Sequence, residues 1–406
     1  MKMLPLKSLM PAHLFLLLLC TGAWSQDTTD LETLHGIQWS YQCNGPIHGS
    51  TLILEDVLYA GSKDKHMYAL NIQGGDLLWK FKSAGAIKST PAASRHLIFF
   101  TTANGSLYAL DKNKGHLVWK FDMQGEKKVD IWDYFLSSPV YSRGKIYVGS
   151  GNGKFYALNA EDGSLLWSFS AGGTIHSTPV LDDTKVYFGS YDGWFYGLNR
   201  TDGSLAWKFN TVGQRWFPKG AVQCGAALHG NTLYFGSRDF NLYALNRETA
   251  TGMWNRYEQG SWVIATPVIK DTLLLFGTSD SHRFYALDRR SGRVLWNTSL
   301  SLNVFGGAAT GTRLVYFGSL DGKIYALNLS NGNIQWSFQT KASKKNWPQV
   351  FDHNNQLRKD LIQNANGSAQ KVYKKIHSLG SILSTPVLHE GKLYFGSMDG
   401  KIYCLY

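Results

Sequence analysis

The chain has 406 residues, of which 44% are hydrophobic and 14% aromatic, so it can bury a large core within one domain. Its formal net charge is +12. No nucleic-acid-binding motif accompanies this basic excess, and no segment after the N-terminal region is long enough to cross a membrane. The composition therefore predicts neither a nucleic-acid partner nor a transmembrane span.

Residues 1–25 predict a secretory signal peptide. Two lysines precede an apolar run from Leu14 to Cys20, and small residues that suit cleavage end at Ser25. Because Leu19 rather than a small residue precedes Cys20, we expect no lipid anchor. The mature chain, 26–406, is predicted to be secreted, and periplasmic if the host is bacterial.

The next predicted element is a strand over residues 36–41, and its form recurs along the chain. Residues 185–209 show the repeat unit, in which three apolar, aromatic-rich runs are joined by tight turns such as Asp192-Gly193. Residues 177–181 add a fourth strand. Tyr-x-Leu begins at Tyr68, Tyr108, Tyr156, Tyr196, Tyr243, Tyr285, Tyr325 and Tyr403.

A tryptophan follows each of the first seven Tyr-x-Leu motifs by eleven residues. Trp39 lies 40 residues before the first of these tryptophans, Trp79. A period of about 40 residues with four strands per repeat predicts a β-propeller. The class is all-β, with eight four-stranded antiparallel blades closed by the N-terminal strand. The structural tryptophans between blades are Trp39, Trp79, Trp119, Trp167, Trp207, Trp254, Trp296 and Trp336.

Two segments carry a family resemblance. Residues 157–167, Ala-Leu-Asn-Ala-Glu-Asp-Gly-Ser-Leu-Leu-Trp, and 286–296, Ala-Leu-Asp-Arg-Arg-Ser-Gly-Arg-Val-Leu-Trp, resemble the tryptophan-docking repeat of PQQ-like propellers. That superfamily includes quinoprotein alcohol dehydrogenases and the BamB branch of outer-membrane assembly scaffolds. The resemblance covers nearly the whole mature chain and implies the fold, whereas one propeller fold hosts unrelated functions.

Three insertions interrupt the repeat. From the repeat tryptophan to the next inner strand the usual distance is twelve residues, but it is twenty after Trp119, nineteen after Trp207 and fifty after Trp336. All three occupy the connection between neighbouring blades, so we expect them on one face, around one mouth of the central channel. Binding functions collect in such loops.

The first two insertions supply candidate partner-binding residues, with capping of the channel as the alternative role. These candidates are Trp132 and Asp133 in the first insertion and Arg215, Trp216 and Lys219 in the second. In blades five and six the turns depart from the consensus. A charged and aromatic cluster at the same mouth is predicted from Arg238, Asp239, Trp262, Asp280 and His282, with a salt-bridged rim as the alternative.

The third insertion, 341–377 in blade eight, holds eight basic residues against two acidic ones. This run could contact an anionic envelope component such as lipopolysaccharide or another polyanion. The alternative, a solvated and partly disordered loop, is the expectation that we favour from composition.

Several other patterns are attributed to turn geometry or packing. The glycine-rich run 149–154 is a turn between strands rather than a phosphate-binding loop, because no helix follows it. The aspartates that recur in the equivalent turns are expected to serve backbone geometry. Cys43, Cys224 and Cys404 make no disulfide framework and are expected to be buried as small hydrophobic residues.

Two classes of function remain open. The first is a non-catalytic, monomeric binding or scaffold propeller that holds a protein, peptide or glycan at the loop-bearing face, with BamB-like envelope assembly as its nearest named form. The alternative is an alcohol or sugar dehydrogenase, for which the resemblance implies PQQ and calcium in the channel. The chain lacks the Cys-Cys pair of the family enzymes and a Cys-x-x-Cys-His haem motif. We therefore expect no cofactor, no metal site and no catalytic residue.

Overall fold

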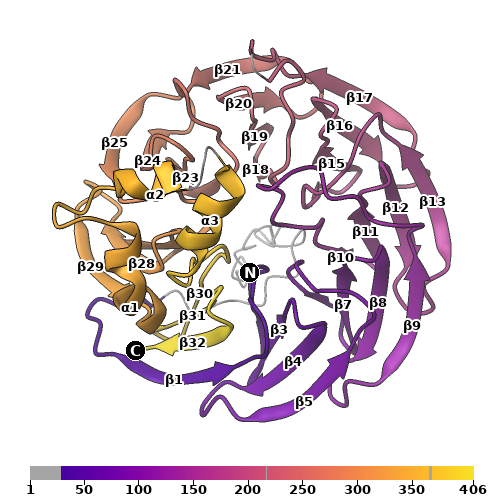
Figure 1. The fold of residues 1–406 in the computed structure, drawn as a ribbon. Helices are drawn as coiled ribbons and strands as arrows, with labels where there is room; N and C mark the ends of the chain where they lie inside the picture. Colours follow the sequence, from indigo (N-terminus) through magenta and orange to yellow (C-terminus); the bar gives the residue numbers. More distant parts are fainter. Residues whose placement is uncertain (1–28, 216, 365–367) are drawn as a thin grey trace, which may run out of the picture.

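The computed structural model describes residues 29–215, 217–364 and 368–406, so the predicted signal peptide lies outside the described residues. Eight four-stranded antiparallel sheets form a ring (Figure 1). The prediction of an eight-bladed propeller is confirmed. In the described part of the chain, no helix has the length and apolar character needed to span a membrane.

The blades follow one another in chain order. Blades one to four contain β2 (Leu52–Leu54), β3 (Val57–Gly61), β4 (His66–Asn71) and β5 (Leu77–Lys82); β6 (Ala92–Ala93), β7 (Leu97–Thr102), β8 (Ser106–Asp111) and β9 (Leu117–Asp122); β10 (Val140–Ser142), β11 (Lys145–Gly149), β12 (Lys154–Asn159) and β13 (Leu165–Ser170); and β14 (Val180–Leu181), β15 (Lys185–Gly189), β16 (Trp194–Asn199) and β17 (Leu205–Asn210).

Blades five to eight repeat the pattern and close the ring. They contain β18 (Ala227–His229), β19 (Thr232–Gly236), β20 (Asn241–Asn246) and β21 (Gly252–Tyr257); β22 (Val268–Lys270), β23 (Leu273–Gly277), β24 (Arg283–Asp288) and β25 (Val294–Ser299); β26 (Ala308–Thr310), β27 (Leu314–Gly318), β28 (Lys323–Asn328) and β29 (Ile334–Gln339); and β30 (Val387–His389), β31 (Lys392–Gly396), β32 (Lys401–Leu405) and β1 (Ile37–Gln42).

The N-terminal strand β1 completes the last blade, as predicted. It pairs antiparallel with β32 from Ile37 opposite Leu405 to Gln42 opposite Lys401. The preceding segment also holds blade seven, because the carboxylate of Asp30 accepts hydrogen bonds from the backbone N–H of Arg313 and of Leu314. The two ends of the chain are therefore joined through one sheet.

All eight repeat tryptophans dock on a neighbouring backbone carbonyl. Each indole Nε1–H donates a hydrogen bond at 2.8–3.2 Å, for example from Trp167 to the carbonyl of Arg200 and from Trp336 to that of Leu31. The middle strands pack face to face between blades, as Phe284 stacks on Phe317 at 3.9 Å between ring centroids. A buried indole with a satisfied N–H combines large apolar area with a fixed orientation.

The recurring turn aspartates serve geometry, as the sequence predicts. In five blades the turn aspartate accepts a hydrogen bond at 2.6–2.7 Å from the hydroxyl of the repeat tyrosine four residues later; the aspartates are Asp64, Asp192, Asp239, Asp321 and Asp399. Blade six differs, because Tyr285 donates instead to Glu258 at 3.0 Å. The aspartate of that turn, Asp280, has no such tyrosine partner.

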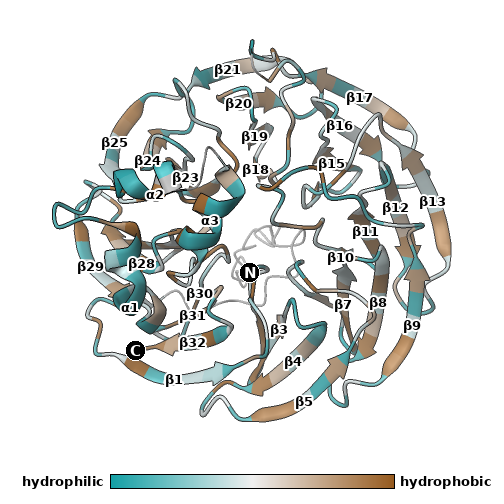
Figure 2. Cartoon of the chain, in the orientation of Figure 1, coloured by the Kyte–Doolittle hydropathy of each residue, from teal (hydrophilic) through white to brown (hydrophobic). Residues whose placement is uncertain are grey.

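The third insertion contains helices, so the expectation of a partly disordered loop is wrong for its described residues. The helices are α1 (Lys341–Val350), α2 (Lys359–Asn364) and α3 (Ala369–His377). Thr340 caps α1 by accepting a hydrogen bond from the backbone N–H of Ser343 at 3.0 Å. The helices lie over one face of the ring, and Figure 2 shows them largely hydrophilic on the side seen. The exposed lysines explain why composition alone suggested a solvated loop.

The turn that contains Gly322 contacts the third insertion, so a substitution there tests how closely the insertion packs on the ring. A Cβ added to Gly322 (φ +75°) would lie 2.1 Å from the carbonyl oxygen of Leu379, whereas Gly144 (φ +77°) has nothing within 4 Å. Both Gly→Ala variants are strained by about 1 kcal/mol from the left-handed backbone. Gly322→Ala should lose a further ~1–3 kcal/mol because the insertion must move. Denaturant unfolding checks this difference, and equal losses for the two variants would contradict a seated insertion.

Candidate functional site

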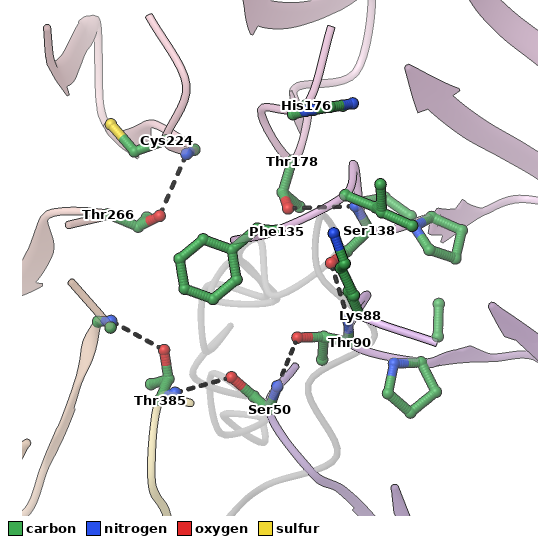
Figure 3. Close-up of a pocket in the computed structure, with 18 of the residues that line it drawn as sticks. Ser50, Lys88, Thr90, Phe135, Ser138, His176, Thr178, Cys224, Thr266 and Thr385 are labelled. Carbon is green, nitrogen blue, oxygen red and sulfur yellow. Dashed lines mark hydrogen bonds between the residues drawn. The ribbon is translucent and has the colours of Figure 1, made fainter. Parts of the chain in front are cut away.

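The inner strands of all eight blades surround a central cavity of about 470 Å³. At its waist, a Ser or Thr side chain of one blade accepts a hydrogen bond from the backbone N–H of the preceding blade (Figure 3). Six such bonds of 2.9–3.4 Å form this hydroxyl rim, whose members are Ser50, Thr90, Ser138, Thr178, Thr266 and Thr385. Gly225 and Gly307 take the two remaining positions and have no hydroxyl to offer.

At seven of the eight blades, the side chain two residues before the rim position also lines the cavity. Three of these positions are polar, namely Lys88, His176 and Gln223. Four are apolar, namely Leu136, Ile264, Phe305 and Leu383. The polar side chains therefore come from blades two, four and five, and the apolar ones from blade three and from blades six to eight.

The three insertions meet over one mouth of this channel, as the spacing predicts. We call this the insertion face; it consists of the described residues within 123–139, 211–226 and 340–386 together with the adjacent turns. Its apolar cluster joins Tyr134 of the first insertion, Phe217 of the second and Ile376 of the third to residues of blades five, six and seven. Segments that are distant in the sequence thus form one surface, although the strands that close the ring do not include them.

Aromatic contacts fix this junction. Trp132 packs edge-on against Trp262 with ring centroids 5.3 Å apart, and against Tyr373 of α3 at 6.1 Å. Phe217 contacts Trp262 from the second insertion at 5.0 Å. Edge-to-face pairs at these distances stabilise the arrangement beyond the area that they bury.

A buried ion cluster anchors the first insertion to blade four. His176 places Nδ1 2.8 Å from a carboxylate oxygen of Asp133 and Nε2 2.7 Å from one of Glu126. Burial acts to lower the pKa of His176, but the hydrogen bonds and charges of the two carboxylates outweigh it and raise the pKa to about 9. Burial acts to raise the pKa of Asp133, but the hydrogen bond and the charge of His176 help to lower it, and the pKa lies below the ordinary value. At neutral pH the cluster holds an imidazolium between two carboxylates.

A second network places Arg238 at the centre of the face. Its guanidinium forms an ion pair with Asp130 and donates to Gln223 Oε1 at 2.6 Å. The same group lies 4.7 Å from the ring centroid of Trp262 and 5.0 Å from that of Tyr191. Cation–π contacts of a partly desolvated Arg contribute about 1–2 kcal/mol. Arg238 therefore links the first insertion to blades four, five and six.

The predicted candidates lie in different surroundings. Trp132, Trp262, Arg238 and Asp280 come together on the insertion face. Asp239 is fully buried and bonded to Tyr243, and Asp133 is buried against His176. His282 is half-buried, and its pKa is lowered by burial, which Asp280 opposes. Arg215 and Lys219 are exposed in the second insertion, and Trp216 lies outside the described residues.

Several residues of this face were not predicted, among them His176, Tyr191, Gln223, Asn303 and Tyr373. The signal for two of them was present in the repeats. His176 and Gln223 occupy the position two residues before the rim, where four of the eight aligned blades have a polar side chain and four have an apolar one. Tyr373 and Asn303 carry no such signal, because their roles depend on contacts between distant segments.

The lining of the central cavity does not match a calcium-bound quinone. Calcium takes oxygen ligands in which carboxylates are prominent. Among the described residues that line the cavity there is no Asp or Glu. Nor does the described part of the chain contain a group of three or more His, Cys, Asp or Glu residues able to hold a metal ion. No catalytic step through a quinone follows from this donor set.

Eight four-stranded blades with a docked indole at every junction define a β-propeller of the tryptophan-docking class. The family described as outer membrane protein assembly factor BamB matches residues 23–137, 103–257 and 210–350. The chain belongs to this family of PQQ-like propellers.

Individual relatives cover shorter stretches. The chain is 30% identical over 158 residues to BamB of Legionella pneumophila, which is 35% of this chain and 40% of that protein. It is 28% identical over 151 residues to the quinoprotein alcohol dehydrogenase PedH of Pseudomonas putida, which is 34% of this chain and 25% of that protein. The matches thus span less than half of these relatives. The crystal structure of BamB from Moraxella catarrhalis has a similar fold, with a TM-score of 0.68 at 18% identity, covering 92% of this chain and 99% of that one.

Proposed function

We propose that this protein is a non-catalytic binding propeller, secreted or periplasmic, that holds a protein, peptide or glycan at its insertion face. One observation carries the proposal. Three insertions from separate inter-blade connections pack into a single apolar cluster over the channel mouth, although the ring closes without them. The named relative BamB is a protein assembly factor, which supports a protein partner and scaffolding of BamB type as the specific form.

The third insertion adds a basic groove that suits an anionic partner, such as an envelope polyanion. A groove of about 770 Å³ runs between α1, α2 and α3, and Arg358, Lys371, Lys374 and Lys375 line it. Asp360, the acidic residue of this lining, is paired with Arg358 at 2.7 Å. Positive charge gathered in a groove raises the local concentration of anions and speeds their association.

Site-specific photo-crosslinking in the native host tests the binding proposal. A photoreactive amino acid replaces Lys374 on the insertion face or, as the matched control, Lys114 in the β8–β9 turn of the opposite face; both side chains are exposed. We expect a discrete crosslinked partner from position 374 and none from position 114. Crosslinks from position 114 alone would place the binding surface elsewhere.

The quinoprotein dehydrogenase remains the second candidate because of the similarity to PedH. The absence of carboxylates from the described cavity lining argues against it. Titration with PQQ and calcium, followed by dye-coupled alcohol oxidation, separates the two candidates. Saturable quinone binding together with alcohol oxidation would overturn the non-catalytic proposal.

A further inference from the structure

A second cavity, of about 230 Å³, lies between the insertions and blades five to seven. Six aromatic rings line it: Trp132, Phe217, Phe240, Trp262, Phe305 and Tyr373. The first two come from the first and second insertions and Tyr373 comes from α3, so all three insertions contribute a wall. We call this cavity the aromatic cage.

The rings of the cage stand at steep angles to one another. The planes of Trp132 and Trp262 meet at 88°, those of Trp132 and Tyr373 at 90°, and those of Phe217 and Trp262 at 83°. Walls set at right angles enclose a small group from several sides. Aromatic faces carry negative electrostatic potential, so such an enclosure attracts an organic cation.

A carboxylate completes the cage through a departure from the repeat. The turn of blade six has one extra residue, and Tyr285 there bonds Glu258 instead of the turn aspartate. Asp280 is consequently released from the role that its counterparts fill in five other blades. It is exposed at the cage, where its partner is the hydroxyl of Ser279, which donates at 2.7 Å.

A buried amide lies at the wall of the cage. Asn303 is 3% exposed, and its side chain interacts with the hydroxyl of Tyr373. The nearby guanidinium of Arg238 is paired with Asp130, which offsets its repulsion of a bound cation.

We propose that the aromatic cage binds an alkylated ammonium group. Both a free alkylammonium compound and the methylated lysine of a partner peptide have this chemistry. The inference rests on the proposed function, because it specifies the cationic group held at the insertion face. Asp280 supplies the charge, and the rings exclude water.

Calorimetric titration of the full chain with choline tests the cage, with neohexyl alcohol as the uncharged carbon isostere. We expect choline to bind and the alcohol to bind at least about tenfold more weakly, since ion pairing and cation–π attraction are lost. Asp280→Asn should weaken choline binding by about tenfold or more. Asp76→Asn removes the same charge from an exposed turn of the opposite face and should leave binding unchanged.

Peptides containing trimethyl-lysine or unmodified lysine distinguish the two ligand sources. Tighter binding of the trimethyl-lysine peptide than of choline assigns the cage to a partner side chain, and the reverse assigns it to a free compound. Equal binding of choline and its uncharged isostere, or unchanged choline binding by Asp280→Asn, would overturn the inference. If neither choline nor the trimethyl-lysine peptide binds while position 374 still crosslinks a partner, the cage is refuted and the proposed function stands. If choline binds but no partner crosslinks, the proposed function fails alone.

Discussion

Deleting residues 36–42 is expected to abolish stable folding at physiological temperature. This segment forms β1, which pairs with β32, and it carries the docked Trp39, 8% exposed. Removing a buried Trp side chain alone costs about 3–5 kcal/mol, a large part of the 5–15 kcal/mol typical of a whole domain. The truncated ring would also present the free edge of β32, a template for aggregation.

Thermal unfolding with light scattering checks this expectation. Trp39→Phe is the control, because it retains the apolar ring and loses chiefly the hydrogen bond to the carbonyl of Ile72. That variant should lose about 1 kcal/mol and remain monodisperse. A truncated protein that unfolds at the parent temperature without aggregation would show that β1 does not close the ring.

The stability of the protein is expected to fall as pH rises from about 6.5 to about 9. The pKa of His176 is about 9 in the folded protein, above the ordinary value of 6.5. The folded state therefore binds more protons than the unfolded state in this window. The stabilisation is complete below pH 6.5 and is lost as pH rises through the folded pKa, a change of about 3 kcal/mol.

His176→Gln isolates this contribution. Glutamine removes the charge and leaves the buried Asp133 without its ion pair, which costs about 3–5 kcal/mol near neutral pH. The loss of stability between pH 6.5 and 9 should largely disappear in this variant. His116→Gln, at an exposed turn, should behave like the parent. An unchanged pH dependence in His176→Gln, measured by denaturant unfolding, would refute the assignment of the buried imidazolium.

Repetition explains how much of the fold could be predicted. The same spacing between tyrosine and tryptophan recurs from blade to blade. Counting residues was therefore enough to predict the number of blades and to place the three insertions on one face of the ring. The sequence of the third insertion contains no repeat of this kind. Its apolar residues Val350 and Ile376 pack against side chains far away in sequence, while its many lysines dominate the local composition.

The candidate site was predicted less well, because identical residues have different roles. Asp239 and Asp280 occupy comparable turns, yet the first is buried on Tyr243 and the second is exposed at the aromatic cage. The difference arises from Glu258, which takes over the repeat tyrosine of blade six. A long-range exchange of hydrogen-bond partners of this kind cannot be read from a local motif.

The hydroxyl rim joins the blades in two separate arcs. Its six bonds connect blades seven, eight, one, two, three and four in one continuous arc and blades five and six in a second, shorter arc. Gly225 and Gly307 mark the two seams. The short arc supplies Phe240, Trp262 and Asp280 to the aromatic cage. At these seams the blades are joined by other bonds, because the backbone N–H of Val222 donates to the carbonyl of Ser190 and that of Val304 donates to the carbonyl of Thr278, both at 3.0 Å. The contacts that hold the short arc beside the cage are therefore backbone bonds and aromatic packing rather than hydroxyl bonds.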